Sequence, residues 1–276
     1  MKIRRRFFPR APISMGAFVF IWCVIPLVYW FELYVVLPAL YEVWSLHYWM
    51  HFIIGHILMI NVLGSYLGLV LIDNSVNRHL NIKDIQPNWR HCDKCNIHVP
   101  PRSWHCAECD LCMLKRDHHC FFTGYCVGHY NHRLFLMFLF YLMIACVYAT
   151  FYNCCFLGRQ MEFSKLLLKT AFSLPMLIFH RQLDITVFYV FIFQIIIAGF
   201  IFVVILFTYH ALLVACGRVG YEKNQNISKY DMGMKQNFIN VFGERWYISW
   251  LSPFISSTLP SNGFCWEVDQ TCTKKN

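Results

Sequence analysis

Charged residues are scarce in this 276-residue sequence, where Asp, Glu, Lys and Arg together make up 14%. Soluble globular domains carry about 25% charged residues, so the polar surface that a water-soluble fold needs is missing here. Hydrophobic residues reach 58%, which excludes an intrinsically disordered chain, a collagen-like chain and a small secreted scaffold. No internal repeat or low-complexity stretch is present. The composition therefore predicts a membrane protein.

Long stretches without any charged residue occur four times, at residues 11–31, 43–72, 134–158 and 185–217. A helix needs about 20 apolar residues to cross the hydrocarbon core of a bilayer. We therefore expect an all-α polytopic membrane protein with four transmembrane helices.

Basic residues are distributed unevenly among the segments that connect these stretches. Of the 24 Lys and Arg residues, none lies between the first and second stretches and four lie between the third and fourth. All the others lie in the N-terminus, in the segment between the second and third stretches, or in the tail. Because positively charged loops stay in the cytosol, these three parts are expected to be cytosolic. The net charge of +9 then reflects loops beside anionic headgroups, and no nucleic-acid partner is expected.

The expected organisation has five parts. They are a basic cytosolic N-terminus (1–10), spans one and two (11–72), a cytosolic cysteine-rich domain (73–133), spans three and four (134–217) and a cytosolic tail (218–276).

Half of the fourteen cysteines gather within the cysteine-rich domain, and three of the domain's histidines are candidate ligands beside them. These ten residues are Cys92, Cys95, Cys106, Cys109, Cys112, Cys120 and Cys126, with His105, His118 and His119. Repeated Cys-x2-Cys steps with interleaved histidines are typical of structural zinc sites, each of which takes four thiolate or imidazole ligands. Two zinc ions would use eight of the ten groups and leave two over.

The stretch Asp117-His118-His119-Cys120 contains groups with a possible catalytic use. The carboxylate can hold the imidazole tautomer, the imidazole can accept the thiol proton, and the thiol can attack. At this point two interpretations remain open. Either the spare groups are catalytic, or the whole cluster is structural.

From Cys92 to Phe135 the sequence resembles the DHHC family of protein S-palmitoyltransferases, including the ending Cys126-Val127-Gly128 followed by Asn131. The resemblance implies two interleaved structural zinc sites, one formed by Cys92, Cys95, His105 and Cys112 and the other by Cys106, Cys109, His119 and Cys126. It implies that Cys120 is the acyl-accepting nucleophile, that His118 is its base and that Asp117 orients His118.

The resemblance also implies an activity. A long-chain acyl group would pass from palmitoyl-CoA to Cys120 and then, in a ping-pong reaction, to cysteines of membrane-proximal proteins. Lys115, Arg116 and Arg133 are candidates for binding the CoA phosphates. The implied location is the endoplasmic reticulum or the Golgi membrane. A tail motif with Tyr230, Asn237 and Gly243 implies that the asparagine packs the tail against the membrane domain.

Some motif positions depart from the family pattern. Phe121-Phe122 stands where the family has Pro-Trp, and Gly124-Tyr125 stands where it has Asn-Asn. Of a Thr-Thr-x-Glu motif after span four, only Glu222 is present. These departures leave a catalytically weak or inactive membrane-anchored zinc adaptor as the alternative. A RING-type ubiquitin ligase is disfavoured, since it needs no Asp-His before a spare cysteine.

The predicted orientation has a direct test in the tail. Asn226-Ile227-Ser228 forms a glycosylation sequon, and glycosylation takes place in the lumen. We expect Asn226 to stay unmodified in cells, so that glycosidase treatment leaves the electrophoretic mobility unchanged. A glycan on Asn226 would contradict the cytosolic tail.

Overall fold

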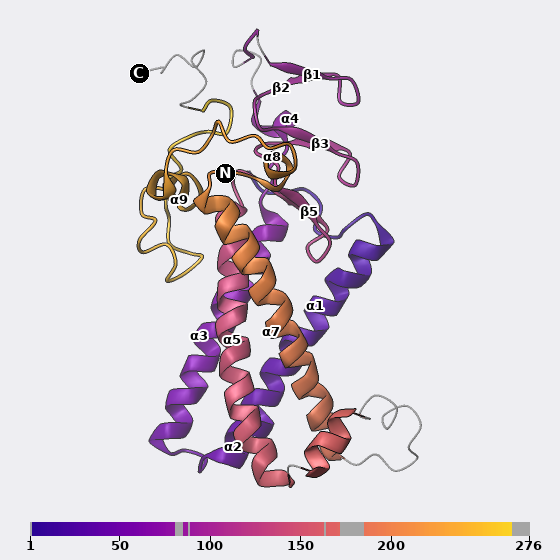
Figure 1. Ribbon diagram of the computed structural model, residues 1–276, viewed down its shortest axis with the longest axis vertical. Coiled ribbons are helices and arrows are strands. Elements are labelled where there is room, and N and C mark those ends of the chain that lie inside the picture. The colour runs from indigo at the N-terminus through magenta and orange to yellow at the C-terminus, as the bar shows by residue number, and fades with distance from the viewer. Residues whose placement is uncertain (1, 81–84, 88, 163, 172–184, 267–276) are drawn as a thin grey trace. The chain divides into compact units, whose positions relative to one another are not determined.

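The computed structural model describes residues 2–80, 85–87, 89–162, 164–171 and 185–266. Within this part of the chain, four helical stretches are long and apolar enough to cross a membrane: 12–40, 46–71, 132–160 and 185–215. The expected four-span fold is therefore confirmed (Figure 1). The connection 172–184 and the last ten residues of the tail lie outside the described residues.

The first stretch consists of α1 (Pro12–Phe31), a π-helical turn η1 (Glu32–Val36) and α2 (Leu37–Leu40). The other three are single helices, namely α3 (Leu46–Leu71), α5 (His132–Gln160) and α7 (Ile185–Ala215). Their nearly continuous apolar sequences suit helices that face lipid as well as protein.

The chain forms two compact units, and each of the long helices contributes residues to both. One unit comprises Trp22–Val62 and Leu139–Phe207. Its core contains Phe31, Phe156, Leu157 and Ile192, all with exposed fractions of 2% or less. Asn153 is fully buried there and donates a hydrogen bond to the Glu32 carboxylate, so this acidic group is paired.

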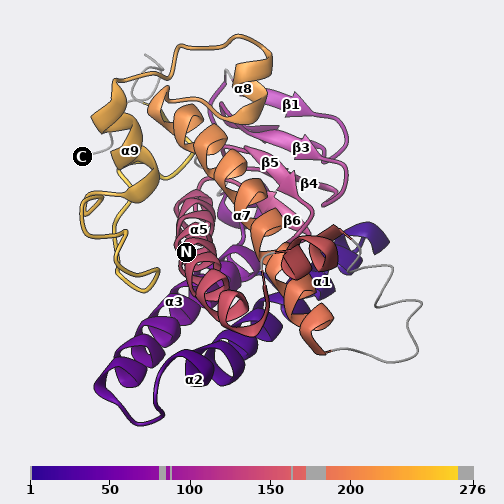
Figure 2. The same ribbon diagram turned by 60° about the horizontal axis from the view of Figure 1, so that its bottom comes forward.

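The other unit comprises Met1–Ile21, Leu63–Phe138 and Thr208–Asn276, and it contains the cysteine-rich domain. Here the domain forms three antiparallel hairpins of three-residue strands: β1 (Arg90–Cys92) with β2 (Ile97–Val99), β3 (Trp104–Cys106) with β4 (Leu111–Met113), and β5 (His118–Cys120) with β6 (Tyr125–Val127). They follow one another in chain order in both views (Figure 1, Figure 2). The predominantly helical fold expected from the sequence thus carries a small β-structured part. Isolated strand pairs this short need other contacts to be stable.

The tail packs onto the end of α7 through a buried asparagine. Asn237, in α9 (Met234–Phe242), donates to the carbonyl of Ala215 at 2.8 Å and to the carboxylate of Asp231 at 2.7 Å. Its side-chain oxygen accepts a bond from the backbone N–H of Met232 at 3.0 Å. Gly217, with φ +64°, lies against the same side chain, and a Cβ there would come within 2.7 Å of Asn237 Oδ1. Asn237 therefore makes the packing contact that the resemblance led us to expect.

A buried ion pair joins the cysteine-rich domain to the tail. Arg102 Nε and Nη2 donate to Oε1 and Oε2 of Glu222, each at 2.7 Å; Glu222 lies in the short helix α8 (Gly220–Asn224). Arg102 also donates to the carbonyl of Gly217 at 2.9 Å, and its guanidinium lies over the rings of Tyr230 and Trp266. Bidentate pairing of this kind gives geometric specificity as well as energy, so Glu222 has a structural partner that its isolated position in the sequence does not reveal.

Removing one member of this pair should be strongly destabilising. In Glu222→Ala the Arg102 charge stays buried without its carboxylate partner, which costs about 3–5 kcal/mol. The thermal midpoint of the protein in detergent should fall clearly below that of Glu244→Ala, a matched change at an exposed tail glutamate. The double replacement Arg102→Leu with Glu222→Leu should regain part of the loss, since it removes the stranded charge. Equal midpoints for the two single variants would contradict a stabilising role.

Candidate active site and metal centres

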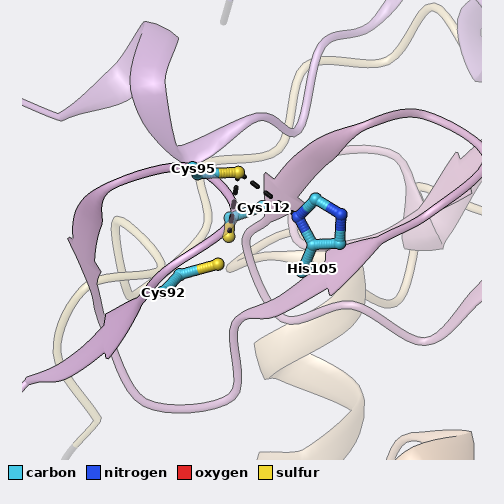
Figure 3. Close-up of side chains that lie close together, drawn as sticks. All are labelled: Cys92, Cys95, His105 and Cys112. Carbon is cyan, nitrogen blue, oxygen red and sulfur yellow. Dashed lines mark hydrogen bonds between the residues drawn. The ribbon is translucent and has the colours of Figure 1, made fainter.

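The first metal-type cluster consists of Cys92, Cys95, His105 and Cys112, whose ligand atoms all lie within 4.8 Å of one another. Cys92 ends β1, Cys95 lies in the following turn, and His105 and Cys112 face each other across the β3–β4 pair. Figure 3 shows the three sulfur atoms and the histidine ring gathered around one point. The Cys95 sulfur lies 3.3 Å from His105 Nδ1 and 3.7 Å from the Cys112 sulfur.

The second cluster consists of Cys106, Cys109, His119 and Cys126, again within 4.8 Å of one another. The Nδ1 atom of His119 lies 3.5, 3.4 and 3.9 Å from the sulfur atoms of Cys106, Cys109 and Cys126. Cys106 and Cys109 belong to the β3–β4 hairpin, whereas His119 and Cys126 are direct partners in the β5–β6 pair. This cluster therefore joins the second hairpin to the third.

Both clusters have the dimensions of a tetrahedral zinc site. Zinc–sulfur bonds of about 2.3 Å and zinc–nitrogen bonds of 2.0–2.1 Å place neighbouring ligand atoms about 3.5–3.8 Å apart. Six of the distances between ligand atoms in the two clusters lie between 3.3 and 3.9 Å, and all lie within 4.8 Å. Each donor set of three thiols and one imidazole fills four positions, which fits a closed structural site.

Strand geometry explains how the two ligand sets interleave. Successive side chains of a strand point to opposite faces, so His105 and Cys106, neighbours in β3, serve different clusters. The two groups of four that the resemblance implied are those that the structure brings together.

The same alternation separates ligand from candidate catalyst in β5. His118 and Cys120 lie two residues apart and share one face of the strand, whereas His119 between them points to the metal-type cluster. The sequence alone left open how such closely spaced groups could meet. The strand places the His118 imidazole and the Cys120 thiol on the same face, where each shifts the pKa of the other.

Asp117 lies just before β5, and its carboxylate is completely buried. One oxygen accepts a bond from the backbone N–H of Gly220 at 2.6 Å, and the other lies 2.8 Å from His118 Nδ1. Burial by itself would raise the pKa of Asp117, but the contacts with His118 and with a second histidine, His210, hold it well below its usual range. The carboxylate is therefore a fixed anion that holds the His118 ring by its Nδ1 atom.

His118 and Cys120 shift each other's protonation. Burial opposes a charged imidazole, yet the hydrogen bonds with Asp117 and Cys120 raise the pKa of His118 to about 10. Burial likewise opposes a thiolate, but the hydrogen bond from His118 lowers the pKa of Cys120. Such an environment activates a nucleophilic cysteine. Phe135, with its ring 4.9 Å from that of His118, covers the imidazole.

His210 is a site residue that the sequence analysis missed. Its Nδ1 atom lies 3.1 Å from the Asp117 oxygen that also contacts His118, and the two imidazole rings are 4.9 Å apart. The signal available in the sequence is a single histidine within the otherwise apolar residues 185–217, close to their C-terminal end.

The three candidates for CoA binding lie in different surroundings. Lys115 is only 4% exposed, with its ammonium 3.5 Å from the carbonyl of Asn240 and 5.4 Å from the ring centre of Trp266. Burial, with the nearby charge of Arg102, lowers the pKa of Lys115 to about 7. Arg116 and Arg133 are half-buried. The assignment of all three to CoA phosphates stays a prediction.

The structure combines four apolar helices with two clusters of three thiols and one imidazole, and it places an activated thiol beside these clusters. These features define a multi-pass membrane protein with a zinc-type cysteine-rich domain. A family model described as DHHC palmitoyltransferase matches residues 85–227, just over half of the chain. The chain belongs to this family, as the sequence analysis expected.

Curated relatives of this chain include proteins named palmitoyltransferases. The chain is 32% identical to the probable palmitoyltransferase ZDHHC24 of Danio rerio over 191 residues, which cover 68% of this chain and 64% of that protein. It is 26% identical to ZDHHC24 of Rattus norvegicus over 76% of this chain and 75% of that protein. It is 38% identical to palmitoyltransferase ZDHHC21 of Homo sapiens over 60% of this chain and 61% of that protein. The matched region thus spans less than two thirds of the first and third of these proteins, and nothing in these findings favours the adaptor alternative.

Metal content should follow the cluster assignment. The purified protein should contain two zinc ions per chain, and Cys106→Ala should reduce this to one and weaken the fold, since binding of structural zinc contributes folding free energy. Cys216→Ala, at an exposed cysteine outside both clusters, is the control and should keep two. Elemental analysis of the three proteins decides. Two zinc ions in Cys106→Ala would mean that this thiol is not a ligand.

Proposed function

We propose that this protein is a protein S-acyltransferase that moves a long-chain acyl group from acyl-CoA to cysteines of membrane-associated proteins through an acyl-Cys120 intermediate. The observation that carries the proposal is the group Asp117, His118 and Cys120, in which His118 and Cys120 share one face of a strand whose other face belongs to a metal-type cluster. Membership of the DHHC palmitoyltransferase family supports the same activity.

In the first half-reaction, the Cys120 sulfur attacks the thioester carbonyl of palmitoyl-CoA. The raised pKa of His118 and the lowered pKa of Cys120 favour the state in which the proton already lies on the imidazole. A new bond forms between the acyl carbon and Cys120, and the bond between the acyl carbon and the CoA sulfur breaks. The proton on His118 then goes to the departing CoA thiolate.

In the second half-reaction, His118 takes a proton from the thiol of a substrate protein. The substrate sulfur attacks the acyl-Cys120 thioester, the acyl group moves to the substrate, and Cys120 leaves as a thiolate stabilised by the protonated imidazole. One histidine thus serves as base and acid in turn, and each cycle returns the site to its starting state.

Asp117 contributes by position and charge. Its carboxylate fixes the His118 ring through Nδ1, which leaves the other ring nitrogen, Nε2, to exchange a proton with Cys120. A fixed anion also stabilises the imidazolium. The two sets Cys92, Cys95, His105 and Cys112, and Cys106, Cys109, His119 and Cys126, would hold zinc ions that stabilise the hairpins, since neither set leaves a position open for substrate.

The bilayer explains why such a site lies next to membrane helices. Each buried methylene of an acyl chain contributes about 0.8 kcal/mol, so a long acyl chain partitions strongly into lipid. Cys120 precedes the start of α5 by only a dozen residues, so its thiol can meet a thioester at the membrane surface. The positive-inside pattern supports a cytosolic site, with Lys115, Arg116 and Arg133 near the CoA phosphates and the endoplasmic reticulum or Golgi as the location.

The Phe-Phe departure is compatible with this activity. The backbone carbonyl of Phe122 accepts a hydrogen bond from the Tyr66 hydroxyl at 2.7 Å, while Phe121 is 56% exposed. The residues after Cys120 are therefore held by Tyr66 of the second span, although the turn contains no proline.

Four single substitutions should separate catalyst from ligand. Cys120→Ser should abolish labelling by a long-chain acyl-CoA and keep two zinc ions, because a serine hydroxyl is too weakly acidic for His118 to activate. His118→Ala should keep zinc and slow acylation by about 10²–10⁴-fold, the range for a lost general base. Asp117→Ala should slow acylation by loss of imidazole orientation. His119→Ala, the matched neighbour, should lose zinc and weaken the fold.

Acyl-enzyme formation and zinc content measured side by side check these expectations. Loss of zinc in Cys120→Ser together with retention of zinc in His119→Ala would mean that Cys120, and not His119, is the zinc ligand. An unaltered protein that takes no label from any long-chain acyl-CoA in membranes would support the zinc-binding adaptor instead.

A further inference from the structure

An arm formed by residues 2–10 precedes α1, and it runs beside the end of α3 and the β5–β6 hairpin. Ile3 forms a β-bridge with Ile72, just past the last residue of α3. The backbone N–H of Arg4 donates to the carbonyl of Leu71 at 2.6 Å, and the N–H of Asp73 donates to the carbonyl of Lys2 at 3.0 Å. The arm is therefore fixed by backbone bonds on both sides of Ile3.

The side chain of Arg4 has two sets of partners. Its Nε and Nη2 atoms donate to the carbonyls of Val70 and Ile72 at 3.1 and 2.9 Å. Carbonyls at a helix C-terminus lack partners within the helix, and a guanidinium there also complements the helix dipole. The same guanidinium lies 3.7 Å from the centre of the Tyr125 ring, within the range of a cation–π interaction. Arg4 thus links the end of span two to β6.

Tyr125 is held by the arm at its other end as well. Its hydroxyl lies 2.9 and 3.0 Å from the carbonyl oxygens of Arg6 and Phe8, which accept its hydrogen. The preceding residue, Gly124, has φ +69°, and a Cβ there would come within 2.3 Å of Pro9 Cγ. Both positions that depart from the Asn-Asn of the family pattern therefore lie against the arm. Tyr125 forms hydrogen bonds with it, and Gly124, which has no Cβ, leaves room for Pro9.

The hairpin register connects this contact to the nucleophile. Tyr125 is the direct cross-strand partner of Cys120. The turn between them is tight, with the N–H of Gly124 donating to the carbonyl of Cys120 at 2.8 Å and the Thr123 hydroxyl donating to the same carbonyl at 3.3 Å. A displacement of Tyr125 is therefore transmitted to Cys120 through a single β-pair.

We propose that the arm is a clamp for the catalytic hairpin, and that Arg4 and Tyr125 are positioning residues for the Cys120 thiol. This inference rests on the proposed function, because the consequence of the clamp is the rate at which Cys120 takes the acyl group. Small displacements of reacting atoms have large effects on rate. Neither Arg4 nor Tyr125 is proposed to bind the acyl donor, palmitoyl-CoA. Loss of the clamp should therefore lower the maximal rate of acylation and leave the KM for palmitoyl-CoA unchanged.

The test compares Arg4→Gln with Arg5→Gln, since Arg5 is the adjacent residue, carries the same charge and is exposed. At saturating palmitoyl-CoA, Arg4→Gln should form acyl-enzyme about tenfold more slowly, while Arg5→Gln should match the unaltered protein. Tyr125→Phe keeps the ring beneath Arg4 and should be affected less than Tyr125→Asn. If the two arginine variants acylate at the same rate, or if Arg4→Gln changes only the KM, the inference is overturned.

A rescue experiment addresses the same contact from the other side. Gly124→Asn introduces a side chain that tolerates a positive φ but collides with Pro9. It should slow acylation, and adding Pro9→Gly should restore much of the rate by removing the colliding atoms. A double variant as slow as Gly124→Asn would argue against docking of the arm at this turn.

Hydrogen exchange of the amides in residues 118–127 gives a readout that needs no activity. Arg4→Gln should speed exchange in this hairpin and Arg5→Gln should not. Equal exchange in both variants overturns the clamp even if the protein is an active acyltransferase. An unaltered protein without acylation, but with faster exchange only in Arg4→Gln, would support the clamp and defeat the proposed function, so the two failures are distinguishable.

Discussion

Strands of three residues are too short to hold their shape in water, and the cysteine-rich domain contains six of them among its described residues. These short strands are linked to one another because thiol and imidazole groups of one hairpin cluster with those of the next. Because neighbouring side chains in a strand point to opposite faces, one strand can contribute to such a cluster with one face and keep the other face for a different use. In β5 the second face carries His118 and Cys120. The chemistry of the site depends on this division, since a helix or an irregular loop would not separate adjacent residues so cleanly.

The second constraint is a buried negative charge. Asp117 has no exposed side-chain surface, and an isolated carboxylate in such a place would be strongly destabilising. A backbone N–H of the tail and two imidazoles, one from the hairpin and one from α7, satisfy it. The β5–β6 hairpin, the end of the fourth span and the start of the tail are thus joined at one carboxylate. The nearby pair of Arg102 and Glu222 joins the domain to the tail a second time.

Much of this arrangement could be predicted from the sequence. The uncharged stretches gave the four helices because length and composition suffice for a span, and the ligand sets followed from a resemblance whose motif spacing is specific. The hairpins were not predicted, because three-residue strands leave no periodicity to detect. His210 and the partner of Glu222 could not be found either, since their roles come from contacts over more than ninety residues of chain. The arm was predicted only as a stretch of positive charge, although Arg4 contacts the end of span two and Tyr125 while Arg5 is exposed.

The alternation in β5 has a consequence for how this stretch can evolve. Substitutions in Asp117-His118-His119-Cys120 change one group at a time, but insertion or deletion of a single residue would turn every following side chain to the opposite face. The two histidines would then exchange surroundings, with one imidazole lost from its metal cluster and the other facing no carboxylate. Length variation between related sequences should therefore be absent from residues 117–120, where spacing matters as much as residue identity.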